Sequence, residues 1–408
     1  MKAVLQIALG ILAAIGGFVD IGDLVFNVQA GSLFQYQLIW AVMVGLIGIV
    51  IFAEMSGRVA AVSKMAAFDL IRERLGFAAG VLVLVSAQLV SLLMLAAEAG
   101  GVAIVLRLFT GLPYPLLIVA AAIALLLILW FMPFDAIERV FGYVGLLLLI
   151  FAVAGIVLHA DWPAAAGGLL PTINLSKPLI YLYFAVGLIG TTMSPYEVYF
   201  YSSGGVEDHW SDKDLPLNRV TVFLGFGLGA VLSLALMVTA AEFFSPKGIQ
   251  PDFLATTPLP VMASLGKVGL LIALAGMLFT IGGAAIETCL SGAYNLAQFF
   301  GWQWGKYHRP SRAGGFSLTW IVFLLLGCLI IMTGVDAVRL TEIAVIFSAV
   351  ALPLTYFPVL LVANDRNYMG KHANGRFANI LGSIYLVILT LVAIASIPLL
   401  VITNGGQG

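Results

Sequence analysis

Residues 16–31 read GGFVDIGDLVFNVQAG and belong to an apolar stretch long enough to cross a membrane. Two carboxylates, Asp20 and Asp23, and the glycine between them interrupt this stretch. A charged side chain at membrane depth costs about 2.5 to 3.5 kcal/mol on insertion scales, so such residues usually have a function. Glycine loosens a helix, and freed backbone groups are tolerated only where protein or water receives them. The stretch therefore predicts a broken membrane helix with a polar site at the break.

The composition excludes a soluble protein. Of the 408 residues, 62% are hydrophobic and only 10% are charged, which is far too apolar for a water-exposed surface. Because each span needs about 20 apolar residues, we expect an all-α polytopic membrane protein of eleven helices without a sizeable soluble domain. The expected spans are centred on Leu12, Leu46, Ser86, Ala121, Leu149, Ala185, Gly229, Ala275, Leu325, Ala351 and Ile388. The first is interpreted as a retained helix, since no small-residue cleavage pattern precedes its carboxylates.

The loops predict the orientation of the chain. With a cytoplasmic N-terminus, fourteen of the 19 Lys and Arg residues lie on the cytoplasmic side and five on the other. This bias favours a chain whose N-terminus is inside and whose C-terminus is outside, in the plasma (inner) membrane. The net charge of −1 does not indicate a partner, and no basic stripe suggests that the protein binds nucleic acid. Cys289 and Cys328 lie in apolar spans and are interpreted as packing residues.

A second interrupted span lies five spans further on. Residues 187–203 read GLIGTTMSPYEVYFYSS, which begins apolar, turns polar in the middle and contains a proline that cannot continue a helical hydrogen-bond ladder. Paired breaks at corresponding positions of two halves indicate an inverted-repeat transporter with its site at the midplane. We expect the first repeat to span residues 1–160, the second 177–364, and an additional helix 375–403.

Each break offers cation ligands and also a simpler explanation. The first half-helix of each pair ends near Phe18 and Val19 or near Thr191 and Thr192, where unpaired carbonyls attract cations. Asp20 and Ser194 stand where an N-cap would bond the amides of the second half-helix, and each is followed three residues later by an acid, Asp23 or Glu197. Capping alone would account for these four residues, but neutral caps would serve equally well at membrane depth. A cation between the halves explains the charges.

The two breaks resemble those of the Nramp (natural resistance-associated macrophage protein) divalent metal transporters. Residues 20–23, with the later Gln29-Ala30-Gly31, are similar to the family's Asp-Pro-Gly-Asn and Gln-Ala-Gly motifs, and residues 193–196 are similar to its Met-Pro-His motif. Residues 283–292 of the eighth span and 352–354 of the tenth extend the likeness over almost the whole chain. The resemblance implies a LeuT-like 5+5 inverted repeat. It also implies that Asp20 is a metal ligand and that Thr191 contributes its carbonyl.

The chain departs from the family at several motif positions. Asp23 replaces the asparagine ligand, and Ser194 replaces the methionine ligand. Oxygen ligands suit magnesium, manganese or calcium, whereas a thioether selects softer metals. Tyr196 and Tyr201 replace histidines, and Leu95 replaces an aspartate, all of which serve proton movement in the family. The pattern is therefore closer to the Nramp-related magnesium transporters.

Other buried acids have more than one interpretation. Glu98, flanked by small residues, is expected to face the bundle, either on an ion path or as a structural carboxylate bonded to a neighbouring helix end. Glu287 either lines an ion path or pairs with a polar group, and Tyr196 is a further candidate for the path. Glu342 is interpreted as a helix-end acid close to water.

These features favour transport of a hard divalent cation, Mn²⁺ and/or Mg²⁺, as substrate, without a cofactor. The expected metal site consists of Asp20, Asp23, Thr191, Ser194 and Glu197. A transporter of amino acids or other small organic solutes with the same architecture is the alternative. It usually needs a free helix N-terminus for a carboxylate, which the two aspartates would oppose. No catalytic motif favours an enzyme. Because no histidine lies at the breaks, we expect uptake down the metal's own gradient without proton coupling.

Overall fold

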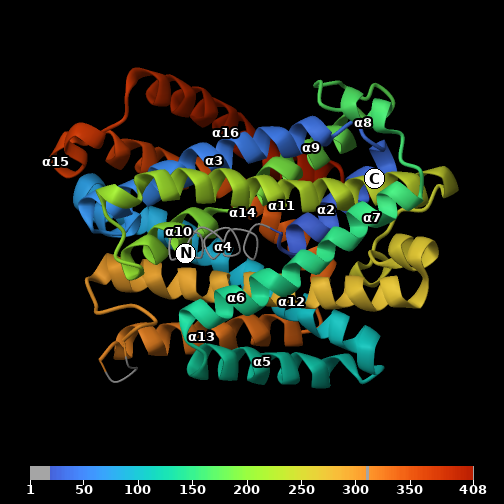
Figure 1. Ribbon diagram of the computed structural model, residues 1–408, viewed down its shortest axis with the longest axis horizontal. Helices are drawn as coiled ribbons and strands as arrows, with labels where there is room; N and C mark the ends of the chain where they lie inside the picture. The colour runs from blue at the N-terminus through green and yellow to red at the C-terminus, as the bar shows by residue number, and fades with distance from the viewer. Residues whose placement is uncertain (1–18, 309–311, 408) are drawn as a thin grey trace.

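The computed structural model describes residues 19–308 and 312–407, and throughout this part of the chain the regular secondary structure is helical (Figure 1). Ten segments in it are long and apolar enough to cross a membrane. They are α3 (Ile39–Ser63), α4 (Ala67–Thr110), α5 (Tyr114–Phe131), α6 with α7 (Phe134–Gly145 and Leu149–Val157), α9 with α10 (Pro178–Thr192 and Pro195–Glu207), α11 (Leu215–Phe243), α12 (Leu259–Phe300), α13 (Gly314–Met332), α14 (Ala337–Ala363) and α16 (Arg376–Ile402).

These ten segments coincide with ten of the eleven predicted spans. The remaining one, centred on Leu12, lies outside the described residues, as does Phe18 at the predicted end of its first half. From that span the structure describes Val19, Asp20 and α2 (Ile21–Phe34). Short helices complete the described chain: α8 (Trp162–Gly167), α15 (Arg366–Met369), and 3-10 turns at Leu146–Leu148, Asp212–Asp214, Ser245–Lys247, Leu254–Thr256 and Gly370–His372.

Burial orders these helices from the centre to the lipid-facing edge. In the most apolar window of the α9–α10 pair, 83% of residues are buried, against 28% in α5 and in α16. Figure 1 accordingly shows α10 near the middle, α5 and α13 along one edge, and α16 along the opposite edge. Because the flanking helices are apolar on all sides, they cover a centre in which polar residues are shielded from lipid.

The second predicted break is present between α9 and α10. Helix α9 ends at Thr192, and α10 begins at Pro195, whose missing amide is tolerated only in the first turn of a helix. Met193 and Ser194 connect the two halves, and both are buried. Helix α2 packs against α9 and α11, so the start of α2 lies beside this connection.

Helices α4 and α12 each contain one glycine with a positive φ. Gly76 has φ 75° and ψ 174°, and Gly266 has φ 69° and ψ −160°. Only glycine adopts this conformation without strain, so each one separates a short N-terminal helical piece from the long span behind it. The two long helices also pack against each other. Helices α4 and α12 therefore share the same interruption near their start and pack side by side.

Candidate functional site

Asp20 caps the N-terminus of α2, as its position in the sequence suggested. Its backbone is extended, and its carboxylate Oδ1 accepts a hydrogen bond of 3.0 Å from the backbone amide of Asp23. The side chain is fully buried. One of the amides left unpaired at this helix end is thus satisfied within the protein.

The same carboxylate joins the two breaks. The Thr191 hydroxyl, at the end of α9, donates to Asp20 Oδ1 at 3.2 Å, and the Tyr196 hydroxyl, in the first turn of α10, donates to Oδ2 at 3.3 Å. All three residues are almost completely buried. The structure therefore brings Asp20 together with Thr191 and Tyr196, both of which lie more than 170 positions after it in the sequence.

Asp23 faces a different helix. Its Oδ1 accepts hydrogen bonds of 3.0 Å from the Asn27 side chain and from Ser233 of α11, while Oδ2 has no hydrogen-bond partner among the described residues. Ser233 was not identified from the sequence. A single serine among the apolar residues in the middle of a span was the available signal, because such a hydroxyl must find a buried acceptor.

Ser194 occupies the N-cap position of α10, but the alternative interpretation, in which its side chain caps the helix, is wrong. Its side chain makes no capping hydrogen bond and instead donates from Oγ to the Thr191 carbonyl at 3.0 Å. The amide of Glu197 bonds to the Ser194 backbone carbonyl at 3.3 Å, so the hydroxyl is not needed there. Ser194 thus holds the carbonyl that the family resemblance implies as a metal ligand.

Hydroxyl groups meet the carbonyls at the end of α9. The Ser348 hydroxyl of α14 donates to Gly190 O at 3.3 Å, and the Tyr356 hydroxyl donates to Met193 O at 2.9 Å. Each carbonyl oxygen has two lone pairs, and a hydroxyl can rotate. The carbonyls at this break can therefore also coordinate a cation.

Glu197 is the least satisfied acid of the region. Only 4% of it is exposed, and neither carboxylate oxygen has a hydrogen-bond partner within the described chain. It lies close enough to Asp20 and Asp23 for their charges to act on it. A buried carboxylate without donors is costly unless it is protonated or paired with a cation. The predicted capping role of Glu197 would require a bond back to the backbone, and this bond is not formed.

The candidate path residues lie on helices beside Tyr196. Glu98 of α4 is fully buried, and its Oε1 accepts from the Thr288 hydroxyl at 3.2 Å, while Oε2 has no partner among the described residues. Glu287, the neighbour of Thr288 on α12, is half-buried. Both acids lie within electrostatic range of Tyr196. Glu98 is thus bonded to a side chain within α12 and not to a helix end, as the structural interpretation had it.

No group of three or more His, Cys, Asp or Glu side chains in residues 19–308 and 312–407 is arranged to hold a metal ion. Carboxylates alone therefore do not form a metal centre here, and a divalent cation at the breaks would also need hydroxyls, carbonyls and water as ligands. This mixed oxygen set is typical of sites for hard cations.

Two further polar clusters lie at the end of α10 and near the start of α14. Glu207, at the end of α10, accepts from the Tyr294 hydroxyl at 2.5 Å and from the Lys306 amide at 2.7 Å. Burial lowers the pKa of Lys306, whose ammonium also donates to the Leu129 carbonyl. Near the start of α14, Glu342 pairs with Arg339 at 3.0 Å.

The interpretation of Glu342 as a helix-end acid close to water is wrong. The residue is 1% exposed, and besides Arg339 it contacts the Gln29 side chain of α2 at 3.4 Å. Arg339 in turn bonds Asn404 beyond the end of α16. Residues near the C-terminus thus cover the acid and exclude water from it.

A protein-family model described as "Natural resistance-associated macrophage protein-like" matches residues 10–398 of this chain. The chain belongs to the Nramp family. It is 23% identical over 386 residues to the divalent metal cation transporter MntH of Deinococcus radiodurans, and this alignment covers 91% of this chain and 85% of that protein. It is 26% identical over 395 residues to MntH of Pectobacterium carotovorum, with 93% and 90% covered.

A crystal structure of the Eremococcus coleocola manganese transporter superposes on this Nramp-family chain with a TM-score of 0.83 at 20% identity, covering 100% of this chain and 88% of that one. This similarity shows that the fold is LeuT-like, as predicted. The ten apolar helices and the membership of the Nramp family show that the chain is an integral membrane protein.

Proposed function

We propose that this Nramp-family protein transports a divalent metal cation across the membrane through the site formed by Asp20, Asp23, Thr191, Ser194 and Glu197. The observation that carries the proposal is the buried contact of Asp20 with both halves of the second break, beside the unpartnered carboxylate of Glu197. Negative charge without enough donors, at membrane depth, is stabilised by a cation that enters and leaves.

We infer that the substrate is a hard cation, Mn²⁺ or Mg²⁺. Every candidate ligand is an oxygen, and Ser194 supplies a hydroxyl where the family resemblance implies a thioether. Hard cations prefer such sets and keep part of their water shell. Tyr196, Glu98 and Glu287 would then line the path by which the hydrated ion reaches the site. No step of this transport needs an enzymatic reaction or a bound cofactor.

An organic-solute transporter is the second candidate, and the geometry supports it less well. A substrate carboxylate usually binds the free amides at the N-terminus of a half-helix. Here Asp20 already occupies an amide at the start of α2, and its own charge would repel such a group. An amino acid would therefore find a negative site where it needs a positive one.

Calorimetry on the purified protein separates the two candidates. We expect Mn²⁺ or Mg²⁺ to bind with a measurable heat that is absent in Asp20→Asn, and a panel of neutral amino acids to give none. Amino-acid binding with no response to either metal would refute the proposal and support the alternative.

We also propose that the N-terminus and the loop of residues 207–219 are cytoplasmic, that the C-terminus is outside, and that transport is uptake through the plasma membrane. The basic residues support this orientation. The C-terminal Gly408 lies outside the described residues, so Lys213 and Lys247, both exposed and expected on opposite sides, are better probes. Because Cys289 and Cys328 are buried, Lys213→Cys should label only after cell lysis and Lys247→Cys in intact cells. The reverse pattern would overturn the orientation.

We further propose the repeat boundaries 1–160 and 177–364, with 375–403 as an additional helix. The glycine breaks in α4 and α12 support this division, since each lies in the third helix of its repeat.

We propose, finally, that transport is not coupled to protons. The four histidines, His159, His209, His308 and His372, lie in turns and loops away from both breaks.

A further inference from the structure

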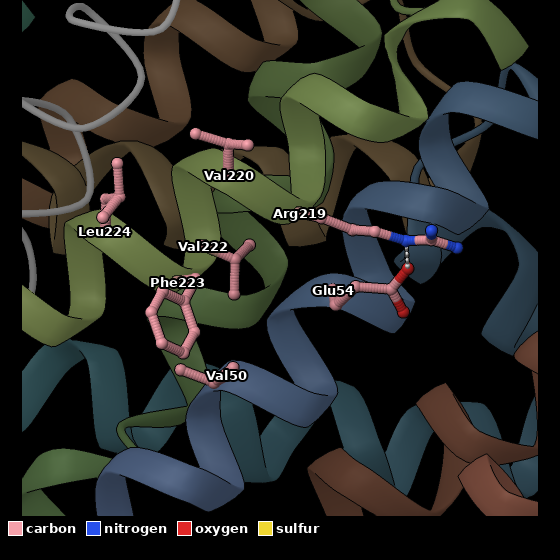
Figure 2. A pocket seen from close by; sticks show the side chains of 7 residues that line it. All are labelled: Val50, Glu54, Arg219, Val220, Val222, Phe223 and Leu224. Atoms are coloured by element: carbon pink, nitrogen blue, oxygen red, sulfur yellow. Dashed lines mark ion pairs between the residues drawn. The ribbon is translucent and has the colours of Figure 1, made fainter.

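A groove with a volume of about 520 Å³ lies between α3 and α11, away from the buried site (Figure 2). Val50 and Glu54 of α3 line it, together with Arg219, Val220, Val222, Phe223 and Leu224 of α11. Figure 2 shows Arg219 and Glu54 together at one end and the apolar side chains of Val50, Phe223 and Leu224 at the other. Phe223 is 69% exposed, so the apolar end opens onto the membrane-facing surface of two spans.

The polar end of the groove has an excess of positive charge. Glu54 lies 3.6 Å from Arg219, but both of its oxygens already accept hydrogen bonds of 3.2 Å from Arg58. Two guanidinium groups thus share one carboxylate, which leaves a net charge of about +1. Of the two, the Arg58 side chain is buried, whereas the Arg219 side chain is 69% exposed. The uncompensated charge is therefore on Arg219.

The geometry of Arg219 leaves its outer nitrogens available. Its ion pair with Glu54 uses Nε, and its two terminal nitrogens have no hydrogen-bond partner among the described residues. A guanidinium with two free terminal nitrogens matches a phosphate group. Arg219 also lies one turn into α11, near the positive end of that helix, where an anion is favoured.

We propose that this groove binds a phospholipid with an anionic headgroup, such as phosphatidylglycerol. The lipid phosphate binds Arg219, and one acyl chain lies along Val50, Phe223 and Leu224. Anionic lipids are concentrated in the cytoplasmic leaflet, the side on which the basic bias places Arg219. The apolar lining excludes a soluble anion as the natural occupant, because phosphate alone leaves that surface uncovered. This inference does not depend on the transported substrate.

Native mass spectrometry of the detergent-purified protein tests the site. After incubation with equal amounts of phosphatidylglycerol and phosphatidylcholine, we expect the wild type to retain the anionic lipid at least about fivefold in preference, about 1 kcal/mol. Arg219→Gln should lose this preference. Lys213→Gln, which removes an exposed cation outside the groove, should keep it. Equal retention of the two lipids, or an unchanged preference in Arg219→Gln, would overturn the proposal.

Two further arms distinguish other occupants. Glycerol phosphate, which has the headgroup chemistry but no acyl chain, should not displace the bound lipid at the same concentration. Displacement would make Arg219 a simple phosphate site and refute the lipid. A photoreactive residue in place of Phe223 should cross-link to lipid. A cross-link to residues 1–18 of the chain instead would identify the protein's own segment as the occupant and would also refute the proposal.

Discussion

Asp20→Asn and Asp20→Ala should separate the two roles of Asp20, namely capping and metal binding. Asparagine is as good an N-cap as aspartate, so it keeps the acceptor for the Asp23 amide and for the Thr191 hydroxyl. Its amide group can also donate to the Tyr196 hydroxyl, which otherwise donates to Asp20 Oδ2. Alanine removes all three contacts. Both substitutions remove the buried charge.

The difference between the two variants follows from these contacts. Loss of the cap costs about 1 kcal/mol, and loss of the acceptor of the buried Thr191 hydroxyl costs about 1 to 3 kcal/mol. The effect of removing the charge itself is common to both. We therefore expect Asp20→Asn to be more stable than Asp20→Ala by roughly 2 to 4 kcal/mol.

Metal binding should fail in both variants alike. Breaking one partner of a buried charge pair costs about 3 to 5 kcal/mol, which corresponds to roughly a 100-fold to 1,000-fold loss of affinity or more. Thermal unfolding in detergent measures the stability, and Mn²⁺ and Mg²⁺ uptake into proteoliposomes measures the transport.

Asp336→Asn is the matched control, because Asp336 caps α14 in the same way at an exposed position. It should be stable and active. Uptake by Asp20→Asn within about tenfold of the wild type, a difference of about 1.4 kcal/mol, would refute the assignment of Asp20 as a ligand. Equal stability of the two Asp20 variants would refute the capping argument.

Three further predictions concern the same region. Ser194→Met should increase the uptake of Cd²⁺ relative to Mg²⁺ by about tenfold, about 1.4 kcal/mol, and an unchanged ratio in a competition assay would count against Ser194 as a ligand. Glu197→Gln should stabilise the metal-free protein by about 1 kcal/mol or more, because it removes a buried charge without donors. The same substitution should reduce the rise in melting temperature that Mn²⁺ produces. A rise equal to that of the wild type would contradict the role of Glu197 as a metal ligand. In liposomes with an internal pH dye and a clamped potential, metal uptake should cause no acidification, whereas acidification that disappears in Glu98→Gln would show that protons are coupled through this acid.

The features that the sequence predicts correctly depend on neighbours along the chain. Proline at position 195 ends the hydrogen-bond ladder of any helix that arrives from Thr192, whatever surrounds it. Asp20 caps α2 through a bond to a residue three positions away. The apolar runs define ten spans for the same reason, because hydrophobic length is a local property.

The features that the sequence does not predict depend on helix rotation. Most of these helices are apolar on every side, so no polar face indicates which way a given side chain points. Asp23 finds Ser233 at a separation of 210 residues, and Gln29 finds Glu342 at 313. The sequence contains 44 glycines, and nothing in the local pattern distinguishes Gly76 and Gly266 as the ones that break long helices.

The three acids at the breaks, Asp20, Asp23 and Glu197, accept different numbers of hydrogen bonds and therefore have different roles in the site. Asp20 accepts from an amide and two hydroxyls, so the protein itself stabilises its charge and fixes its position. Asp23 has both donors on one oxygen, and Glu197 has no donor within the described chain. A site in which every oxygen was satisfied by the protein would gain little from a metal ion, and one with none satisfied would not hold its shape. Asp20 therefore anchors the site, while Asp23 and Glu197 retain the oxygens that gain most when a cation arrives.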